Sequence, residues 1–315
     1  MARYIARLLV SMTITLFVII SVSFFVMRLM PMSIFDDPYL PPETVRMLEE
    51  RMGLHEPLHV QYFMFISSLA QWDWGHSVRI RPRVPVFDVI RERIPITLIL
   101  NLSALAVALP LGVIAGTLSA IKRDKLPDHI VSFLVVLFIS VPSFVFASVM
   151  QFFLGGRLGL FPLIYDATAS TIGTIAFSMT MPVIALALGP IATVSRYLRG
   201  ELIETMSSEF LLLARTKGLS HRQAIVRHAF RNSLVPLINI IVPMFTGIMT
   251  GSLVIERIFA VPGMGGILVD SINSGDHPLT IALLLFFSII MLLTIMIMDI
   301  SYGLVDPRIK IGGKR

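Results

Sequence analysis

The chain has 315 residues, of which 55% are hydrophobic, and its mean hydropathy is +0.82. Soluble domains do not carry this balance, so the composition indicates a membrane protein with several spans. The net charge of +6 would suit nucleic-acid binding in a soluble protein, but basic residues in a membrane protein first report topology and lipid contact. Because the chain has no cysteine, disulfides, thiol catalysis and cysteine metal sites are excluded.

The N-terminal part carries Arg3 and Arg7, followed by an apolar run over residues 8–27. This run is too long for the apolar core of a signal peptide, and no small-x-small cleavage pattern follows it, so we expect a retained first span. Residues 31–93 are polar, mixed in charge and rich in proline. They predict a folded external segment with a short helix near residues 42–52.

The external segment holds both tryptophans, Trp72 and Trp74, whose amphipathic rings suit the membrane interface. It also holds His55, His59 and His76. Their irregular spacing, with no carboxylates arranged around them, favours surface histidines over a metal site.

Five further apolar runs each approach the ~20 residues that a helix needs to cross a bilayer. Two of the runs contain Gly-x-x-x-Gly, at Gly112/Gly116 and at Gly247/Gly251, a pattern that predicts close helix packing. The five runs cover residues 96–121, 130–154, 171–194, 237–255 and 279–304.

The fold class that follows is an all-α polytopic membrane protein with six transmembrane helices and a mixed external segment. Its predicted parts are an N-terminal tail with the first helix (1–30), an extracytoplasmic segment (31–95) and a five-helix core (96–315). The core includes a cytoplasmic loop at residues 197–235.

Basic residues set the orientation. The short loops on one side hold only Arg157 and Arg257, whereas the segments on the other side, which include both termini, are rich in lysine and arginine. The long external segment has balanced charge and weighs little. The bias predicts that both termini and the loop between the fourth and fifth spans are cytoplasmic.

Charged residues are almost absent from the expected spans. We find only Arg28, which can snorkel at the outer end of the first span, and Asp299 near the inner end of the last. An ion-driven carrier usually needs ionisable groups at mid-depth. The sequence also lacks a phosphate-binding Gly-x-x-x-x-Gly-Lys-Ser/Thr loop and a catalytic constellation. We therefore expect the chain to depend on another protein for energy.

The loop at residues 208–236 is the one long basic, helix-forming segment between the spans. Ser208 suits a helix cap, Gly218 suits a left-handed helix end, and Ser220 with Gln223 forms a capping box. We expect two short amphipathic helices joined at Gly218, with Pro236 opening the next span. These features alone leave two interpretations open: a loop that only fixes orientation, or a docking element.

Several motifs resemble one family. ISVPSF (139–144), ARTKGLSHRQAIVRHAFRNSLVP (214–236), ERIFAVPGMGGILVDSINSGDHP (256–278) and DISYGLVDPRIK (299–310) are similar to the integral-membrane permeases of bacterial ATP-binding-cassette importers. The similarity is to the peptide/nickel branch, in particular the oligopeptide permeases, and it covers essentially the whole chain.

The resemblance implies an assembly. A heterodimer of this chain with a second permease would form the pathway, two cytoplasmic ATPase subunits would drive it, and an extracytoplasmic binding protein would deliver the peptide. ATP and magnesium would be held by the ATPase subunits, so no cofactor is expected on this chain. The protein would be a multi-pass component of the bacterial cytoplasmic membrane, in contact with lipid and not with nucleic acid.

The resemblance also implies two sets of site residues and no catalytic or metal site. The set for coupling to the ATPase is Ala214, Arg215, Lys217, Gly218, Leu219, Ser220, His221 and Arg222. The set facing the binding protein from the external loop is Phe259, Pro262, Gly263, Gly265, Asp270 and Asp276.

The chain departs from the family pattern at two places. Leu212, Leu213 and Ala214 stand where importers generally have Glu-Ala-Ala, which leaves any salt bridge there in doubt. PMSIFDDP at residues 31–38 replaces Pro-Gly-Asp-Pro.

The alternatives to an oligopeptide permease are a permease for dipeptides, nickel or metal chelates, and, from another class, a stand-alone channel or secondary carrier. A membrane-embedded enzyme comes third, because the sequence shows no catalytic set.

Overall fold

The computed structural model describes residues 2–29, 42–51, 53–250 and 252–305. Within these ranges the regular structure is helical, with one isolated bridge between His76 and Pro85. The chain forms two compact units, one of residues 1–95 with 264–315 and the other of residues 96–263. Gly251, residues 31–38 and the side chain of Asp299 lie outside the described part, so the predictions made for them remain predictions.

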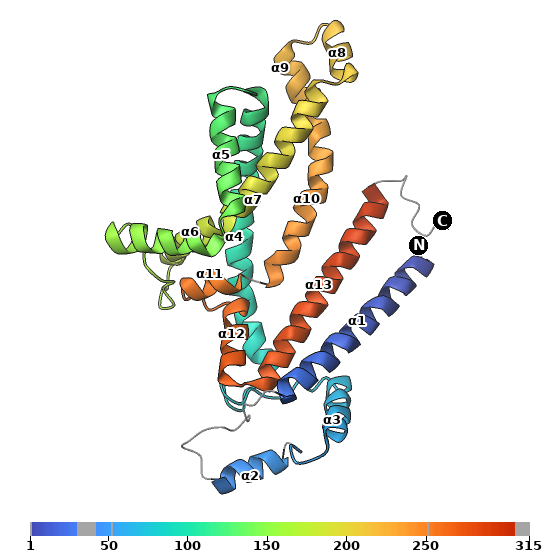
Figure 1. The fold of residues 1–315 in the computed structure, drawn as a ribbon, viewed down its shortest axis with the longest axis vertical. Coiled ribbons are helices and arrows are strands. Elements are labelled where there is room, and N and C mark those ends of the chain that lie inside the picture. Colours follow the sequence, from blue (N-terminus) through green and yellow to red (C-terminus); the bar gives the residue numbers. More distant parts are fainter. Residues whose placement is uncertain (1, 30–41, 52, 251, 306–315) are drawn as a thin grey trace. The chain divides into compact units, whose positions relative to one another are not determined.

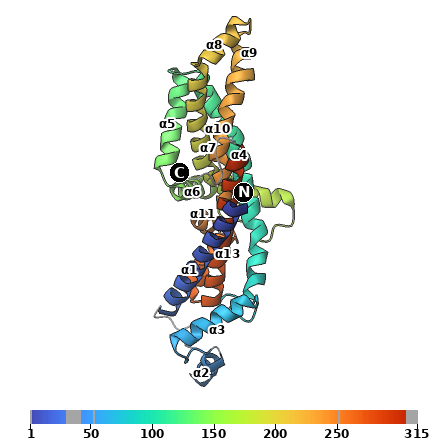
Figure 2. The same cartoon turned by 90° about the vertical axis from the view of Figure 1, so that its right-hand side faces the viewer.

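The unit formed by the two ends of the chain is built on two long apolar helices that lie side by side, α1 (Ala2–Leu29) and α13 (His277–Val305) (Figures 1 and 2). α3 (Leu58–Ala70) packs against the end of α1, where the Phe24 and Phe65 rings stack with centroids 5.1 Å apart. The unit also contains the predicted short helix, now α2 (Pro42–Arg51), as well as α12 (Met264–Ser274) and the first residues of α4 (Val86–Ile121).

The second unit contains the rest of α4 and a set of helices packed around α7 (Ile172–Met206). α10 (Phe230–Thr250) lies beside α7, with the loop helices at their shared tip (Figure 1). The remaining elements are α5 (Leu126–Ser140), α6 (Ser143–Met150), the π-helical turn η1 (Gln151–Arg157), α8 (Glu209–Thr216), α9 (His221–Ala224), the π-helical turn η2 (Ile225–Ala229) and α11 (Leu253–Ile258).

By length and composition, four of the described helices can cross a membrane. They are Ala6–Leu29 of α1, α4, α7 and His277–Ile297 of α13, and α5 with α6–η1 adds a fifth if this bent pair is one span. The all-α polytopic class is confirmed. The count of six remains a prediction, because the helix at the expected fifth span, α10, is not among these and ends at Thr250.

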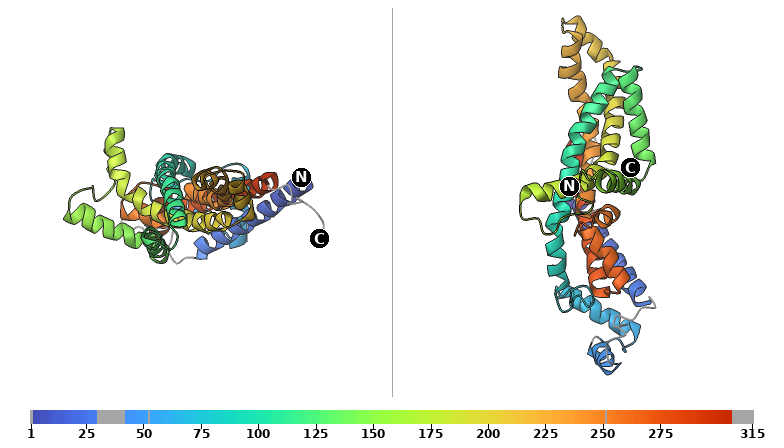
Figure 3. Two further views of the ribbon diagram at one scale, coloured as in Figure 1. Left: turned by 90° about the horizontal axis from the view of Figure 1, so that it is seen from above. Right: turned by 90° about the vertical axis from the view of Figure 1, so that its left-hand side faces the viewer.

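The helical segment at the predicted span of residues 130–154 is broken at Pro142 and bent by 101° (Figures 1 and 3). A proline ring disfavours helical geometry in the preceding residue, and Val141 is accordingly extended at φ −95° and ψ 125°. Pro182 and Pro190 lie inside α7. Pro236 lies inside α10, so no helix begins at this residue, and its place at the opening of a span remains a prediction.

The first Gly-x-x-x-Gly pair brings α4 against α7, as predicted. A Cβ atom added at Gly116 would lie 2.7 Å from the carbonyl oxygen of Ser195, and one at Gly112 would lie 2.8 Å from Cβ of Val194. Real Cβ atoms do not approach other atoms so closely. The two backbones are therefore in contact because neither glycine has a side chain.

This contact predicts that Gly116→Leu destabilises the protein by about 1–3 kcal/mol or more, because the added side chain must push the α7 backbone away. Gly200→Leu, on α7 itself, is the matched control, since a Cβ there meets nothing within 4 Å. The measurement is the thermal unfolding temperature of each purified variant in detergent, which should be lower for Gly116→Leu than for Gly200→Leu. Equal melting temperatures for the two variants would contradict the close packing.

Candidate functional site

The basic loop at residues 208–236 begins directly after α7. Ser208 occupies the cap position of α8 with an extended backbone at φ −75° and ψ 148°. The predicted side-chain cap does not form, because the Ser208 hydroxyl instead donates to the carbonyl oxygen of Thr205 at 2.6 Å. Glu209 lies in the first turn of α8, where the helix dipole favours a negative charge.

Gly218 closes α8 in the predicted left-handed conformation, with φ +93°. A side chain there would meet nothing within 4 Å, so only backbone geometry calls for glycine. The predicted capping box follows at once. The Ser220 hydroxyl accepts a hydrogen bond from the backbone N–H of Gln223 at 3.3 Å. The side-chain Oε1 of Gln223 in turn accepts from the backbone N–H of Ser220 at 3.1 Å.

The second loop helix does not end at Pro236. α9, η2 and α10 follow one another without a gap from His221 to Thr250, and the junction residues Ile225 and Phe230 are helical. The first loop helix is tied to the second on one face, where the Phe210 ring meets the His228 ring edge-on at 5.8 Å. A displacement of the loop is therefore carried into α10 by continuous helical backbone.

The exposure of the loop separates the predicted coupling residues. Ala214 was expected at the contact with the ATPase subunit. It is only 8% exposed, so its methyl group packs within this chain. Leu219 is half-buried, and the exposed members are Arg215, Lys217, Gly218, Ser220, His221 and Arg222. Beside them Leu212 is 62% exposed and Leu213 is 57% exposed. Two adjacent exposed leucines among cations form an amphipathic contact surface.

The motif at residues 256–263 is a buried anchor within its unit. Phe259 is fully buried in a cluster with Leu100, Met181 and Ile255, and its carbonyl oxygen accepts from the Tyr165 amide at 2.7 Å. The side chain of Phe259 therefore packs beneath the surface of this loop and is not exposed on it.

Glu256 is fully buried and its Oε1 accepts a hydrogen bond from the Thr97 hydroxyl at 3.1 Å. A Cβ atom at Gly263 would lie 2.5 Å from this carboxylate. The spacing of glutamate and glycine in the motif is thus a packing requirement, since the carboxylate occupies the space of the missing side chain.

Asp276 holds the start of α13 against residues 77–80 of its own unit. Its carboxylate is fully buried and accepts hydrogen bonds from the Ser77 hydroxyl and from the backbone amides of Arg79 and Ile80, both at 3.0 Å. It also accepts from the amide of Val78 at 3.2 Å. Hydrogen bonds to a carboxylate are stronger than neutral ones, so this cradle fixes the segment.

The predicted binding-protein residues therefore divide into two groups. Phe259, Gly263, Gly265 and Asp276 are buried within this chain, so their side chains do not form its exposed surface, and contact with a binding protein remains a prediction. Asp270 is exposed and Pro262 is partly exposed.

The sequence interpretation missed a buried ion pair. Arg199 of α7 pairs with Asp128 of α5 through two hydrogen bonds of 2.7 Å each, and the Ser119 hydroxyl also donates to Asp128. Both residues lie outside the spans expected from the sequence, one of which begins at residue 130 and another of which ends at residue 194. An acid in the first turn of α5 was the only local signal.

These features define an all-α membrane protein with a basic helical loop at one end of α7 and α10. A family model described as "Binding-protein-dependent transport system inner membrane component" matches residues 108–311, and a model of the N-terminal part of such components matches residues 1–101. The chain belongs to this family, the membrane permeases of ATP-binding-cassette importers. Members of this family are membrane transport subunits and not enzymes, so the predicted class of transport subunit is confirmed.

Two curated relatives match over nearly their whole length. The dipeptide transport system permease protein DppB of Lactococcus lactis subsp. cremoris is 40% identical over 312 residues, which is 99% of this chain and 100% of the relative. The oligopeptide transport system permease protein OppB of Haemophilus influenzae is 36% identical over 311 residues, which is 98% of this chain and 100% of the relative. The resemblance to peptide permeases is confirmed.

A solved chain of the MetNI methionine ABC transporter has a TM-score of 0.56 at 16% identity, covering 70% of this chain and 98% of that chain. At this identity the likeness shows the fold alone.

The cradle around Asp276 yields a prediction. Asp276→Asn replaces an acceptor oxygen by an amide that faces N–H donors, so we expect a loss of about 2–3 kcal/mol, and Ser77→Ala should lose about 1 kcal/mol. Asp88→Asn, an exposed site, should stay within about 0.5 kcal/mol of the wild type. Thermal unfolding in detergent ranks the three variants, and a stable Asp276→Asn protein would refute the anchoring role.

Proposed function

We propose that this chain is one of two permease subunits of an ATP-driven importer that carries oligopeptides across the bacterial cytoplasmic membrane. The observation that carries the proposal is the match to peptide permeases over essentially the full length of both chains, at 34–40% identity. Dipeptides are the second candidate substrate, because relatives at 40% and 35% identity are named for dipeptide transport.

The proposed complex contains a second permease, two cytoplasmic ATPase subunits that hold ATP and magnesium, and an extracytoplasmic binding protein. The family description, which names transport that depends on a binding protein, supports the last of these. The sequence has no phosphate-binding loop of its own, which supports separate ATPase subunits. The distribution of basic residues supports a cytoplasmic position for both termini and for the loop at residues 208–236.

The same loop would couple ATP hydrolysis to the pathway. Leu212 and Leu213 can enter an apolar groove on an ATPase subunit, while Arg215 and Lys217 pair with acidic groups or carbonyls at its edge. α7 leads into the loop and α10 leads out of it, and these two helices pack together. A push on the loop therefore acts on two neighbouring helices at once.

Uptake assays test the substrate class. Deletion of this subunit should abolish uptake of a labelled oligopeptide, and the wild-type gene should restore it. Loss of dipeptide uptake alone would favour the second candidate. If both peptides still enter while nickel uptake collapses, the peptide assignment is refuted.

Glycine geometry tests the coupling. Gly218→Val forces a β-branched residue into a left-handed conformation at a cost of about 1–2 kcal/mol and should redirect α8. Gly159→Val is the matched control, because Gly159 also has a positive φ, +61°, with nothing within 4 Å of its Cβ position. ATPase-subunit retention and substrate-stimulated ATP hydrolysis should fall only for Gly218→Val. Wild-type values for both variants would leave the loop as a topology signal.

A further inference from the structure

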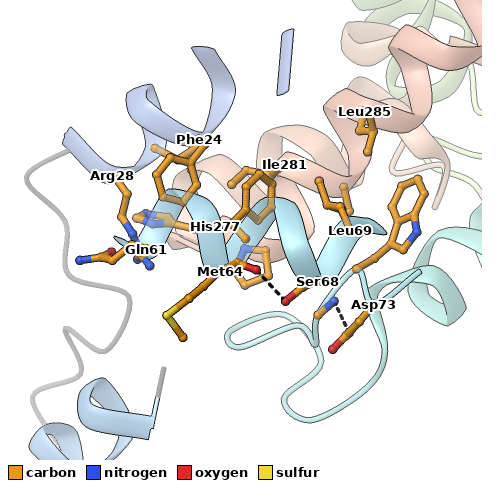
Figure 4. A pocket seen from close by; sticks show the side chains of 16 residues that line it. Phe24, Arg28, Gln61, Met64, Ser68, Leu69, Asp73, His277, Ile281 and Leu285 are labelled. Atoms are coloured by element: carbon orange, nitrogen blue, oxygen red, sulfur yellow. Dashed lines mark hydrogen bonds between the residues drawn. The ribbon is translucent and has the colours of Figure 1, made fainter. Parts of the chain in front are cut away.

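A pocket of about 230 Å³ lies within the unit formed by the two ends of the chain (Figure 4). α1, α3, the turn at residues 73–75 and the first turns of α13 line it. None of the residues predicted for coupling or for contact with a binding protein lines this pocket. Its lining combines buried polar groups with a larger apolar wall.

Three polar side chains in the lining have atoms without a hydrogen-bond partner. Both ring nitrogens of His277 are unpaired, although this residue is only 5% exposed. Oε1 of Gln61 is unpaired while its amide nitrogen donates to backbone carbonyl oxygens at 2.7 and 2.9 Å. Nε of Arg28 is also unpaired, and the guanidinium lies 5.7 Å from the Phe24 ring centre. Buried polar atoms are rarely left in this state, so the site calls for a polar ligand.

The pocket is amphipathic along its length. Arg28 and Gln61 lie at one end, and Leu69 and Leu285 lie towards the other (Figure 4). Phe24 and Ile281 continue the apolar wall. A fully polar ligand would leave this wall without a partner, and a fully apolar ligand would leave the nitrogen and oxygen atoms unpaired.

The Asp73 carboxylate lies away from Arg28 and accepts a hydrogen bond from the Gly75 amide at 2.9 Å (Figure 4). It therefore does not neutralise the cation. The anionic group of a ligand would lie at the Arg28 end.

The depth of the pocket in the membrane identifies the class of ligand. Arg28 is in the last turn of the span Ala6–Leu29, and His277 is the first residue of the span His277–Ile297. The polar end of the pocket thus lies where two spans reach the headgroup layer, and its apolar wall follows both spans into the hydrocarbon. A molecule of the bilayer has its phosphate and its acyl chains at these depths.

We propose that this pocket binds one phospholipid. Its phosphodiester pairs with the Arg28 guanidinium, which matches phosphate geometry, and accepts a hydrogen bond from His277. An acyl chain lies along Phe24, Ile281 and Leu285. Oε1 of Gln61 accepts from the headgroup, which selects a headgroup with a donor, such as ethanolamine or glycerol, over choline.

Native mass spectrometry of the whole importer complex tests the site. The complex is stripped of lipid with detergent, then incubated with phosphatidylethanolamine, phosphatidylglycerol, phosphatidylcholine, oleate or inorganic phosphate. The wild type should retain one ethanolamine or glycerol lipid. Arg28→Gln and His277→Leu should each weaken retention roughly 10- to 100-fold, and Arg28→Lys should weaken it less. Arg91→Gln, an exposed arginine outside the pocket, should match the wild type.

A second readout does not depend on a mutated cation. Trp74 lines the pocket, so a phospholipid with brominated acyl chains should quench part of the fluorescence of the wild-type complex and not that of Trp74→Phe. Equal retention by Arg28→Gln and Arg91→Gln would overturn the proposal. So would retention of choline lipid or oleate at the wild-type level, occupancy by phosphate alone, or a pocket that holds only water.

Discussion

A bilayer offers no hydrogen bonds to backbone groups, and this constraint determines where the chain places its charges. Helices satisfy their own backbone except at their ends, where the first amides and last carbonyls lack partners. The described part of the chain buries three carboxylates, Asp128, Glu256 and Asp276. Asp128 and Glu256 lie in the first turns of α5 and α11, and Asp276 directly precedes α13. Each buried acid therefore lies at the end of a helix that favours negative charge.

This constraint explains why buried carboxylates in a charge-poor membrane chain need not belong to an ion pathway. The Asp276 carboxylate accepts hydrogen bonds from the Ser77 hydroxyl and from a run of backbone amides. The Asp128 carboxylate accepts hydrogen bonds from Arg199 and Ser119. Removing one partner of such a group would leave a buried charge uncompensated, which costs several kcal/mol. The acids thus hold helix ends in position.

Local patterns predicted much of the fold from the sequence. The apolar runs, the Gly218 turn and the capping box at Ser220 each depend on residues within one turn of one another, so propensity and spacing suffice. The contact at Gly116 was also predicted, because a glycine pair on one helix face has few other uses.

Features that depend on distant residues were not predictable in this way. Nothing in the sequence distinguishes Pro142, which breaks a helix, from Pro190, which lies inside one, because neighbouring helices decide the outcome. The pairing of Asp128 with Arg199 joins residues 71 positions apart. The burial of Ala214 and Phe259 likewise depends on tertiary packing, so a motif that resembles a docking site can be partly an internal anchor.

The loop at residues 208–236 combines both kinds of information. Its capping box and glycine turn are local, yet its exposed leucines stand where importers generally have a glutamate and an alanine. Replacing an acid by leucine exchanges a possible ion pair for apolar area, which contributes about 25 cal/mol per Å² when buried. Such a contact depends less on ionic strength than a salt bridge does. Coupling in this chain would therefore rest on shape and apolar burial, with the cations at the edge setting orientation.

In the pocket beside α1, buried polar side-chain atoms lack hydrogen-bond partners from the described part of the chain. Thr117 and Ser195 also have unpaired hydroxyls, but each stands singly on a helix, whereas Arg28, Gln61 and His277 converge on one cavity. At the starts of α5, α11 and α13 a buried carboxylate from the chain lies at the positive end of the helix dipole. Here the described residues supply the Arg28 cation and the His277 ring, and none of the ion pairs among them involves Arg28. The anion that completes the pattern is abundant at this depth in a membrane, because every phospholipid carries one.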